Sequence, residues 1–310
     1  MKIPQKLLWR VGRNLIYLLV FGIAFWTHPA LFAPVESGIL DVEEYCSGIE
    51  NHSLQVAGHH VHYLAEGPDS GPPVVLIHGL GGNAEDWLEV ARYLGKAGYR
   101  VYLPDLIGYG RSDKPAEFSY SVPDEAEVVI GFLDVLGLKQ VDLGGWSMGG
   151  WIVQEVASQQ PARVRRLILI DAAGLNVKPD WDTRLFTPAT PSELREFFAL
   201  LMPKPWKPPD FAARIFVHIR QEQYWVIRRA ISSMLNGRDA TDNLLPKFRM
   251  PVLIVWGELD RVFPLKQGET MHRLVPQSQL EVIIGCGHRT VRQCADQIGP
   301  KLVEFEKRQE

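Results

Sequence analysis

The chain has 310 residues, 46% of them hydrophobic, which is enough to bury a large core in one domain with an insertion. The formal net charge of -3, with lysine and arginine scattered along the chain, argues against nucleic acid as a partner. The three cysteines, Cys46, Cys286 and Cys294, are too few and too odd in number for a disulfide framework. They also match no metal-ligand spacing, so the sequence predicts neither a metal nor a cofactor.

Residues 1–35 are predicted to form a membrane anchor. Leu15 to Trp26 is an unbroken apolar run that follows four basic residues. A cleaved signal peptide favours small residues at its cut, but Leu31-Phe32-Ala33 begins with a bulky side chain, and Pro34 follows it. A retained anchor is therefore favoured over cleavage. Because the run is near the lower length limit for a span, a helix in the membrane interface and a helix packed on the protein's own surface stay open as alternatives.

The charges around this segment predict its orientation. Basic residues precede it and acidic residues follow it, so the positive-inside rule places the N-terminus in the cytoplasm. A single N-terminal anchor would then leave the catalytic part on the periplasmic or lumenal side. Residues 36–51 are expected to be an acidic linker, and residues 52–171 the first part of a catalytic core.

The core begins with a predicted hairpin. Ser53 to Val56 and His60 to Glu66 alternate apolar and polar residues around Ala57-Gly58. His60 and His62 would share one face of the second strand, which invites the hypothesis of a metal site. No cysteine or carboxylate cluster completes such a site, so we expect a solvated edge strand.

Val74 to Ile77 is a short, wholly apolar segment, typical of a strand buried on both faces of a parallel sheet. It runs into the glycine-rich turn at residues 78–82, HGLGG, which matches no phosphate-binding pattern. We expect this turn to present the backbone N–H of Leu80 to a reaction centre, as half of an oxyanion hole completed by Met148. His78 is expected to be a structural histidine beneath the turn.

Helices and short strands alternate after this turn. Helical periodicity covers Asp86 to Lys96 and Val122 to Leu136, with a strand at Arg100 to Leu103 between them. Asp105 and Arg111, in the glycine-stiffened loop that follows this strand, are expected to fix the loop by hydrogen bonds rather than to touch a substrate. The alternation predicts an α/β fold with a mostly parallel sheet, whose ligands lie at the carboxyl ends of the strands.

The segment Gly144-Gly145-Trp146-Ser147-Met148-Gly149-Gly150 lies between a predicted strand and a predicted helix. It contains the G-x-S-x-G pattern of a nucleophile elbow, in which a strained turn exposes a serine hydroxyl above the sheet. Glycine is needed there because strand and helix approach too closely for side chains. Ser147 is the predicted nucleophile.

Residues 172–249, between the strands Leu167 to Ile170 and Val252 to Val255, are expected to form a helical lid after the sixth strand. The segment is rich in proline and in aromatic residues. A helical insertion above the carboxyl ends of the strands suggests an apolar substrate. Most of its aromatic side chains are expected to fix the insertion to the core, and a minority to line a pocket.

Residues 250–308 are predicted to complete the core and to supply an acid and a base. Asp260 follows one strand and His288 the last, in the order Ser, Asp, His that this architecture uses. The histidine would take the serine proton, and the aspartate would fix its tautomer. Glu258 and Asp171 are rivals for the acid. Cys286, two residues before His288, is interpreted as a small buried hydrophobe rather than a nucleophile.

With these motifs assembled, residues 50–308 resemble the α/β-hydrolase superfamily. The motifs that carry the resemblance are HGLGG, PDLIGYGRSD, GWSMGG, WGELD and GCGH, and they occur in the family's order. Within it, the chain looks most like the membrane-anchored monoacylglycerol lipases, through the N-terminal segment, the run Ile170 to Leu175 and the helix start at Thr190 to Leu194. The resemblance implies the triad Ser147, Asp260 and His288, with Leu80 and Met148 as oxyanion donors. Trp146 departs from the smaller or polar residue common in relatives.

The sequence thus predicts a serine esterase acting on lipid esters beside a membrane, monoacylglycerols first, with no obligatory protein partner. One alternative is a C–C bond hydrolase of ring-fission diketones, which has the same triad but is usually soluble. Another is a catalytically silent, membrane-tethered binding module, which the complete triad disfavours.

Overall fold

The computed structural model describes residues 49–308. The predicted anchor in residues 1–35, and all of the predicted linker before residue 49, therefore lie outside the described residues. Within residues 49–308, no helix is both long enough and apolar enough to cross a bilayer.

Eight strands form one sheet in the order β1-β2-β4-β3-β5-β6-β7-β8. Their bounds are β1 Glu50–Val56, β2 His59–Glu66, β3 Pro73–Ile77, β4 Arg100–Pro104, β5 Val141–Trp146, β6 Val164–Ile170, β7 Val252–Gly257 and β8 Gln279–Ile283. The pairings of β2 with β1 and β4 are antiparallel, and all others are parallel. The predicted α/β class with a mostly parallel sheet is confirmed.

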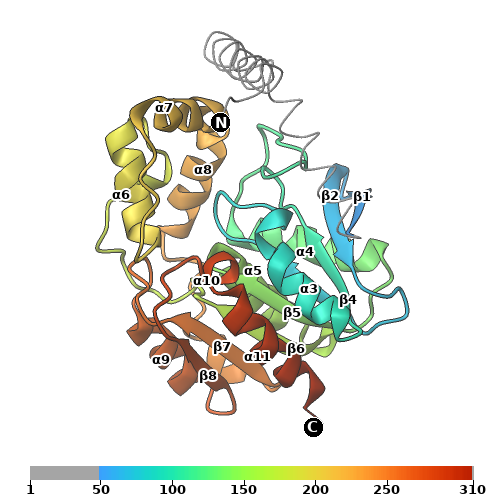
Figure 1. The fold of residues 1–310 in the computed structure, drawn as a ribbon. Helices are drawn as coiled ribbons and strands as arrows, with labels where there is room; N and C mark the ends of the chain where they lie inside the picture. Colours follow the sequence, from blue (N-terminus) through green and yellow to red (C-terminus); the bar gives the residue numbers. More distant parts are fainter. Residues whose placement is uncertain (1–48, 309–310) are drawn as a thin grey trace, which may run out of the picture. The chain divides into compact units, whose positions relative to one another are not determined.

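Helices cover both faces of this sheet (Figure 1). Their bounds are η2 Ala84–Trp87, α3 Leu88–Lys96, α4 Val122–Val135, α5 Met148–Gln159, η3 Pro161–Arg163, α9 Leu265–Leu274, α10 Thr290–Gln293 and α11 Ala295–Lys307. Trp87 and Leu94 pack with Leu302 of α11 in one apolar core, whereas Phe132 of α4 and Ile152 of α5 belong to the other. The inner strands are buried on both sides because both cores rest on them, which explains their unbroken apolar sequences.

The predicted hairpin is present, with Ala57 and Gly58 both at positive φ (49° and 85°) in its turn. Its first strand begins at Glu50, three residues earlier than expected. The expectation of a solvated edge strand is wrong for β2, which lies between β1 and β4. His62 on β2 is only 5% exposed and belongs to a hydrogen-bond network described below. Local alternation could not reveal this, because the strand on the far side of β2 comes from a distant segment.

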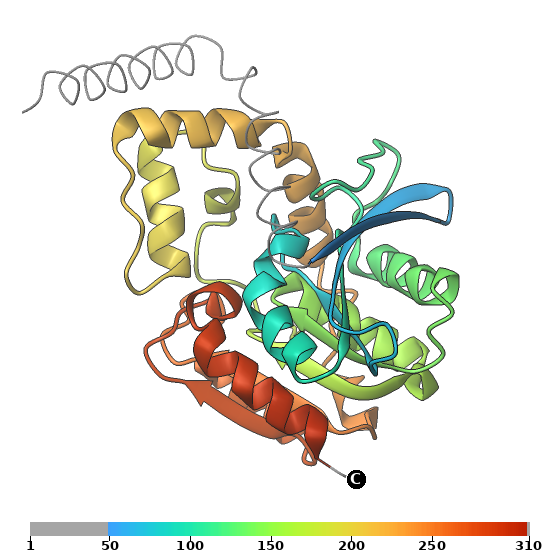
Figure 2. The same cartoon turned by 45° about the vertical axis from the view of Figure 1, so that its right-hand side comes forward.

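The helical insertion follows the sixth strand, as predicted, and consists of η4 Thr183–Phe186, α6 Pro191–Leu201, α7 Asp210–Gln221, α8 Tyr224–Met234 and η5 Leu245–Lys247. Figures 1 and 2 show α6, α7 and α8 grouped together at one side of the sheet. The Thr190 side chain accepts a hydrogen bond from the Glu193 N–H (3.2 Å), which caps the start of α6. Successive ring contacts from Trp181 through Phe186, Phe197 and Phe198 hold the insertion together.

A disulfide joins Cys286 and Cys294, whose Cα atoms are 6.5 Å apart. The sequence did not predict this bond, and Cys286 is buried as expected. The spacing of eight residues gives no pattern in the sequence. The pair forms because the turn after β8 and the short helix α10 fold back onto the start of α11.

Candidate active site

The serine of the elbow lies between β5 and α5, at the carboxyl end of the sheet. Ser147 has φ 58° and ψ -120°, a backbone conformation that is costly for a residue with a side chain. A Cβ atom on Gly145 would lie 2.2 Å from the carbonyl oxygen of Gly149, and one on Gly149 would lie 2.2 Å from that of Ile77. Only glycine fits at these two positions, which is the steric reason for the G-x-S-x-G pattern.

Three side chains from separate loops meet at this elbow. His288 Nε2 lies 2.9 Å from Ser147 Oγ, and His288 Nδ1 lies 2.8 Å from Asp260 Oδ2. All three residues are buried, with at most 6% exposed. Asp260 Oδ1 also accepts hydrogen bonds from the N–H groups of Val262 (2.7 Å) and Phe263 (2.9 Å), which fix the carboxylate. The geometry is that of a serine, a base and an orienting acid.

The two rival acids lie elsewhere. Glu258 is exposed, and its Oε2 accepts a hydrogen bond from the Gly285 N–H (3.0 Å) in the turn after β8. Asp171 is fully buried and accepts hydrogen bonds from the Gly257 N–H (2.8 Å) and the Thr290 hydroxyl. Burial and the neighbouring Asp260 carboxylate raise the pKa of Asp171 well above its ordinary value. Asp171 therefore links β6, β7 and α10 instead of contacting the histidine.

Among residues 49–308, the spacing of Asp171, Asp260 and His288 would admit a metal ion, since their ligand atoms lie within 4.8 Å of one another. Both oxygens of each carboxylate accept hydrogen bonds, and both nitrogens of the histidine have partners within the protein. The protein itself therefore satisfies these atoms, in two separate sets of hydrogen bonds: Asp260 with His288 and Ser147, and Asp171 with Gly257 and Thr290.

Leu80 and Met148 are positioned by the turn after β3 and by the first turn of α5. Met148 is the first residue of α5, where a backbone N–H has no acceptor within its own helix. Leu80 lines the same cavity as Ser147. The peptide group between Gly79 and Leu80 is oriented by two hydrogen bonds to its carbonyl oxygen, from the His78 ring (2.8 Å) and from the Gly82 N–H (3.0 Å). Because the N–H of a trans peptide points away from its C=O, these bonds also orient the Leu80 N–H.

His78 is the structural histidine that the sequence predicts. Its Nε2 accepts a hydrogen bond from the Leu106 N–H (3.0 Å), so Nδ1 carries the proton that it donates to Gly79. Burial lowers the pKa of His78, which keeps the ring neutral and preserves this tautomer.

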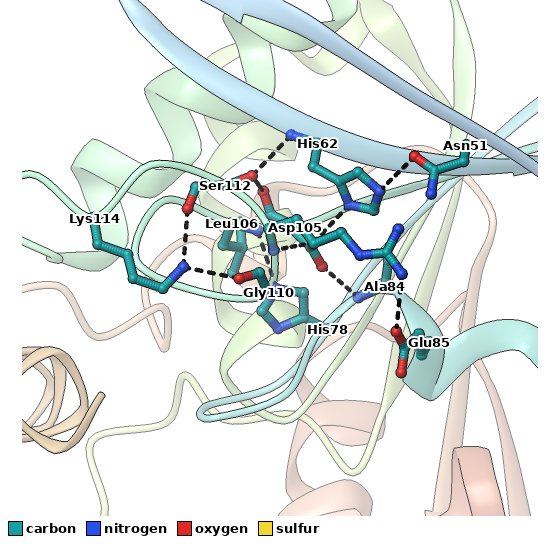
Figure 3. Close-up of polar contacts among 11 residues, drawn as sticks. Asn51, His62, His78, Ala84, Glu85, Asp105, Leu106, Gly110, Ser112 and Lys114 are labelled. Atoms are coloured by element: carbon teal, nitrogen blue, oxygen red, sulfur yellow. Dashed lines mark hydrogen bonds and ion pairs between the residues drawn. The ribbon is translucent and has the colours of Figure 1, made fainter. Parts of the chain in front are cut away.

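Asp105 organises the loop beneath this turn (Figure 3). Its carboxylate accepts hydrogen bonds from the N–H groups of Ala84 (2.6 Å) and Arg111 (2.8 Å) and lies 2.7 Å from His62 Nδ1. Burial acts to raise the pKa of Asp105, but these hydrogen bonds and the nearby histidines lower it below its ordinary value. The expected loop-fixing role of Asp105 is confirmed.

Two supporting residues were not predicted. The indole N–H of Trp146 donates to the His288 carbonyl (2.7 Å), and the Thr290 hydroxyl donates to Asp171. Trp146 is buried and does not line the cavity, so its size does not narrow the substrate's path. Its position before the serine was noticeable in the sequence, but its hydrogen-bond partner is 142 residues away.

An apolar cavity of about 1010 Å³, including the space at its open mouth, extends from Ser147 beneath the insertion. Its apolar lining comes from several elements and includes Leu80, Leu175, Trp181, Phe186, Ile231 and Met234. Among the phenylalanine, tyrosine and tryptophan residues of the insertion, Trp181 and Phe186 line it and the others do not. The expectation that a minority would do so is confirmed.

Comparison with known proteins agrees with this site. The sequence profile described as "alpha/beta hydrolase fold" matches residues 72–291. The chain belongs to the α/β-hydrolase fold family. The hydrolase is 27% identical over 289 residues to "Lipase 1" of Psychrobacter immobilis, covering 89% of this chain and 90% of the lipase. It is 30% identical to a 2-hydroxymuconate semialdehyde hydrolase of Pseudomonas putida, covering 76% of this chain and 86% of that enzyme.

Among solved structures, the hydrolase is similar to a bacterial membrane phospholipase A. The TM-score is 0.78 at 27% sequence identity, and the match covers 97% of this chain and 99% of the other. The relatives therefore include both lipases and C–C bond hydrolases. Together with the site geometry, they identify this chain as a serine hydrolase of the α/β fold.

Proposed function

We propose that this hydrolase cleaves carboxylic esters of lipidic alcohols, monoacylglycerols first. The observation that carries the proposal has two parts. His288 is hydrogen-bonded to both Ser147 and Asp260, and Ser147 lines an apolar cavity. An apolar cavity with few polar groups suits an acyl chain whose ester carbonyl reaches the serine. The likeness to "Lipase 1" supports the same substrate class.

In the proposed reaction, Ser147 Oγ attacks the ester carbonyl carbon while its proton passes to His288 Nε2. The N–H groups of Leu80 and Met148 stabilise the negative oxygen of the tetrahedral intermediate. His288 then gives the proton to the departing alcohol oxygen, which leaves an acyl-enzyme on Ser147. A water molecule then attacks the acyl carbon and gives one proton to His288 Nε2. His288 passes this proton to Ser147 Oγ as the bond to the serine breaks and the fatty acid leaves. Asp260 stabilises the charged imidazole throughout.

The surface of the insertion supports a lipid interface. Of the ten large hydrophobic side chains that are exposed in residues 49–308, six belong to the insertion: Val177, Trp206, Phe211, Ile219, Trp225 and Leu235. Several exposed apolar side chains within one part of a fold are expected where that part contacts a membrane or another apolar partner. We propose that the insertion is a lid that faces a bilayer to which the N-terminal segment anchors the chain.

The disulfide supports a location on the periplasmic or lumenal side. Disulfides persist in oxidising compartments and are rare in the cytosol, where thiols are kept reduced. The bond between Cys286 and Cys294 therefore agrees with the orientation that the charge bias predicts for the anchor.

A second candidate is hydrolysis of a C–C bond in ring-fission diketones, which the likeness to the 2-hydroxymuconate semialdehyde hydrolase favours. The same serine, base and oxyanion groups could serve that reaction. The apolar character of the cavity and of the insertion surface makes it the weaker proposal.

The test is release of fatty acid from monoacylglycerols of increasing chain length in detergent micelles, with the full chain and with Ser147→Ala. We expect release that depends on Ser147 and peaks at medium or long chains. Fluorophosphonate labelling of Ser147 without release from any ester would contradict the lipid substrate, and ring-fission diketones would be assayed next. If Ser147 is not labelled and no ester is cleaved, the result would support the catalytically silent binding module.

A further inference from the structure

Three arginines converge next to the loops that supply the base and one oxyanion donor. Arg220, at the end of α7, donates a hydrogen bond to the carbonyl oxygen of Gly81, the residue after Leu80. Arg289 follows His288, and Arg292 lies one turn further in α10. None of the three lines the apolar cavity, and they adjoin the reaction centre through Gly81 and His288 instead.

A single carboxylate serves this cluster. Asp86 Oδ1 lies 3.1 Å from Arg292 Nη1 and 3.6 Å from Arg289 Nη2, and within residues 49–308 these two guanidinium groups have ion pairs with no other acid. Arg220 has no ion pair among the same residues; its guanidinium lies 5.6 Å from the centre of the Phe216 ring. Three positive charges therefore face one negative charge, so the ion pairs within residues 49–308 leave about two of the positive charges without a counter-ion.

This excess charge is partly withdrawn from water. The side chains of Asp86 and Arg289 are 7% and 24% exposed, and Arg292 is 48% exposed at the outer side. Burial lowers the pKa of Arg220, and burial together with repulsion from Arg292 and Arg220 lowers that of Arg289, although Asp86 opposes both effects. Partly buried like charges destabilise a fold unless an anion compensates them, so the arrangement is expected where a ligand supplies that anion.

The guanidinium groups of the three arginines favour one kind of anion, a phosphate. Each guanidinium presents five N–H donors in a planar fork, and the hydrogen bonds that the three arginines make to other residues in 49–308 use few of these donors. Several convergent forks suit the tetrahedral oxygens of a phosphate, which accept charge-assisted hydrogen bonds from more than one direction. An acyl ester whose alcohol carries a phosphate could place its acyl chain in the apolar cavity and its phosphate at the arginines.

We propose that Arg220, Arg289 and Arg292 form a binding site for the phosphate of an ester substrate, so that the hydrolase prefers acyl esters of phosphorylated glycerol to neutral monoacylglycerols. This inference rests on the proposed hydrolysis of lipid esters, and within that class it puts the phosphorylated esters ahead of neutral monoacylglycerols. The arginines act in binding; the bond broken is still the acyl ester, with water as the second reactant.

The experiment compares 1-oleoylglycerol with 1-oleoylglycerol 3-phosphate in the same neutral detergent micelles, using the full chain. The readout is the ratio of the two kcat/KM values, phosphate ester over neutral ester. We expect a ratio above one for the wild type, and a fall of about tenfold or more in that ratio for Arg292→Gln and Arg289→Gln. Arg220→Lys, which keeps the charge but loses the fork, should give an intermediate fall.

Arg214→Gln is the matched control, because Arg214 is an exposed arginine on the same helix as Arg220. It should leave the ratio and both individual rates unchanged. The use of a ratio separates phosphate recognition from any general loss of activity caused by disturbing the oxyanion loop.

The outcomes are distinct. Hydrolysis of the neutral ester without preference for the phosphate ester, or a ratio unchanged in the arginine variants, overturns the inference and leaves the proposed function intact. No hydrolysis of either ester contradicts the proposed function itself. If inorganic phosphate inhibits cleavage of the neutral ester while the phosphate ester gains no advantage, the arginines bind free phosphate, and the substrate assignment is wrong.

Discussion

Ser147 and its neighbours show how single residues set the chemistry of this site. The serine adopts a positive φ because the chain must turn from β5 into α5 within one residue, and glycines on either side leave room for that turn. His288 and Asp260 then reach it from loops more than a hundred residues later. Two predictions at this scale separate the residues of the site by role.

The first concerns the acid. Asp260→Asn should lower kcat on the order of 10⁴-fold, because the amide favours the wrong histidine tautomer. Asp171→Asn should lower kcat far less, because the Asp171 carboxylate is hydrogen-bonded to the Gly257 N–H and the Thr290 hydroxyl and not to His288. The measurement is kcat for both variants on one ester, with the folded fraction checked by circular dichroism. A larger loss of kcat in the Asp171 variant would mean that Asp171, at the end of β6, is the catalytic acid instead of Asp260.

The second concerns His78, which orients the peptide group that contains the Leu80 N–H. Loss of one oxyanion donor costs about 10²- to 10³-fold in kcat, and His78→Ala should approach the lower end of that range with a smaller change in KM. His218→Ala, at an exposed histidine of α7, is the control. A change confined to KM would argue that His78 shapes the substrate pocket instead.

At the scale of elements, the segment from β8 to α11 is the one that folds around His288. The disulfide between Cys286 and Cys294 encloses His288, Thr290 and α10. The Trp146 indole and the Leu201 carbonyl, which accepts a hydrogen bond from the His288 N–H (3.0 Å), hold the same segment from the core and from the insertion. The position of His288 therefore depends on contacts with two other parts of the chain.

We predict that breaking this disulfide weakens both stability and activity. The chain-entropy estimate for a loop of this length is about 2–3 kcal/mol in the free energy of unfolding. Cys286→Ser with Cys294→Ser should lose that amount in denaturant titrations and lose activity severalfold, because His288 lies inside the loop. A reductant should reproduce the effect in the wild type and have none in the double variant. Equal stability of the wild type and the double variant would show that the bond contributes nothing.

At the scale of the molecule, buried acids away from the site link stability to pH. Glu306 of α11 is 4% exposed and lies near Asp142 of β5, which is fully buried. Burial and the nearby Asp142 carboxylate raise the pKa of Glu306 to about 10 from its ordinary value of 4.5. The folded chain therefore holds a proton that the unfolded chain releases above that ordinary value.

Because folding takes up this proton, the contribution of Glu306 to the free energy of unfolding should decrease as pH rises from about 4.5 towards 10. The slope for one proton is at most about 1.4 kcal/mol per pH unit. Glu306→Gln should make the stability of the protein less dependent on pH in this window, as measured by urea titrations at pH 6, 7 and 8. Glu304→Gln, at an exposed position of the same helix, should keep the wild-type slope. Parallel slopes in all three proteins would mean that Glu306 is ionised in the folded state.

The sequence by itself determined the fold class, the elbow, and the serine and histidine that are hydrogen-bonded to each other, and it put Asp260 first among three candidate acids. Each of these depends on local patterns: apolar runs of strand length, glycines where a Cβ would clash, and polar residues placed after strands in a fixed order. Parallel strands bring such residues to one edge of the sheet, so their meeting could be inferred before the geometry was known. The choice of Asp260 over Asp171 and Glu258 remained open, because all three follow strands.

Only the tertiary structure decided which of these acids meets His288, that Cys286 pairs with Cys294, and that His62 is buried against Asp105. It also brought Arg220 from the insertion to the loop that contains Leu80. These contacts join segments whose separation along the chain leaves no periodic pattern. They depend on how distant loops pack against one another, which local residue preferences do not determine.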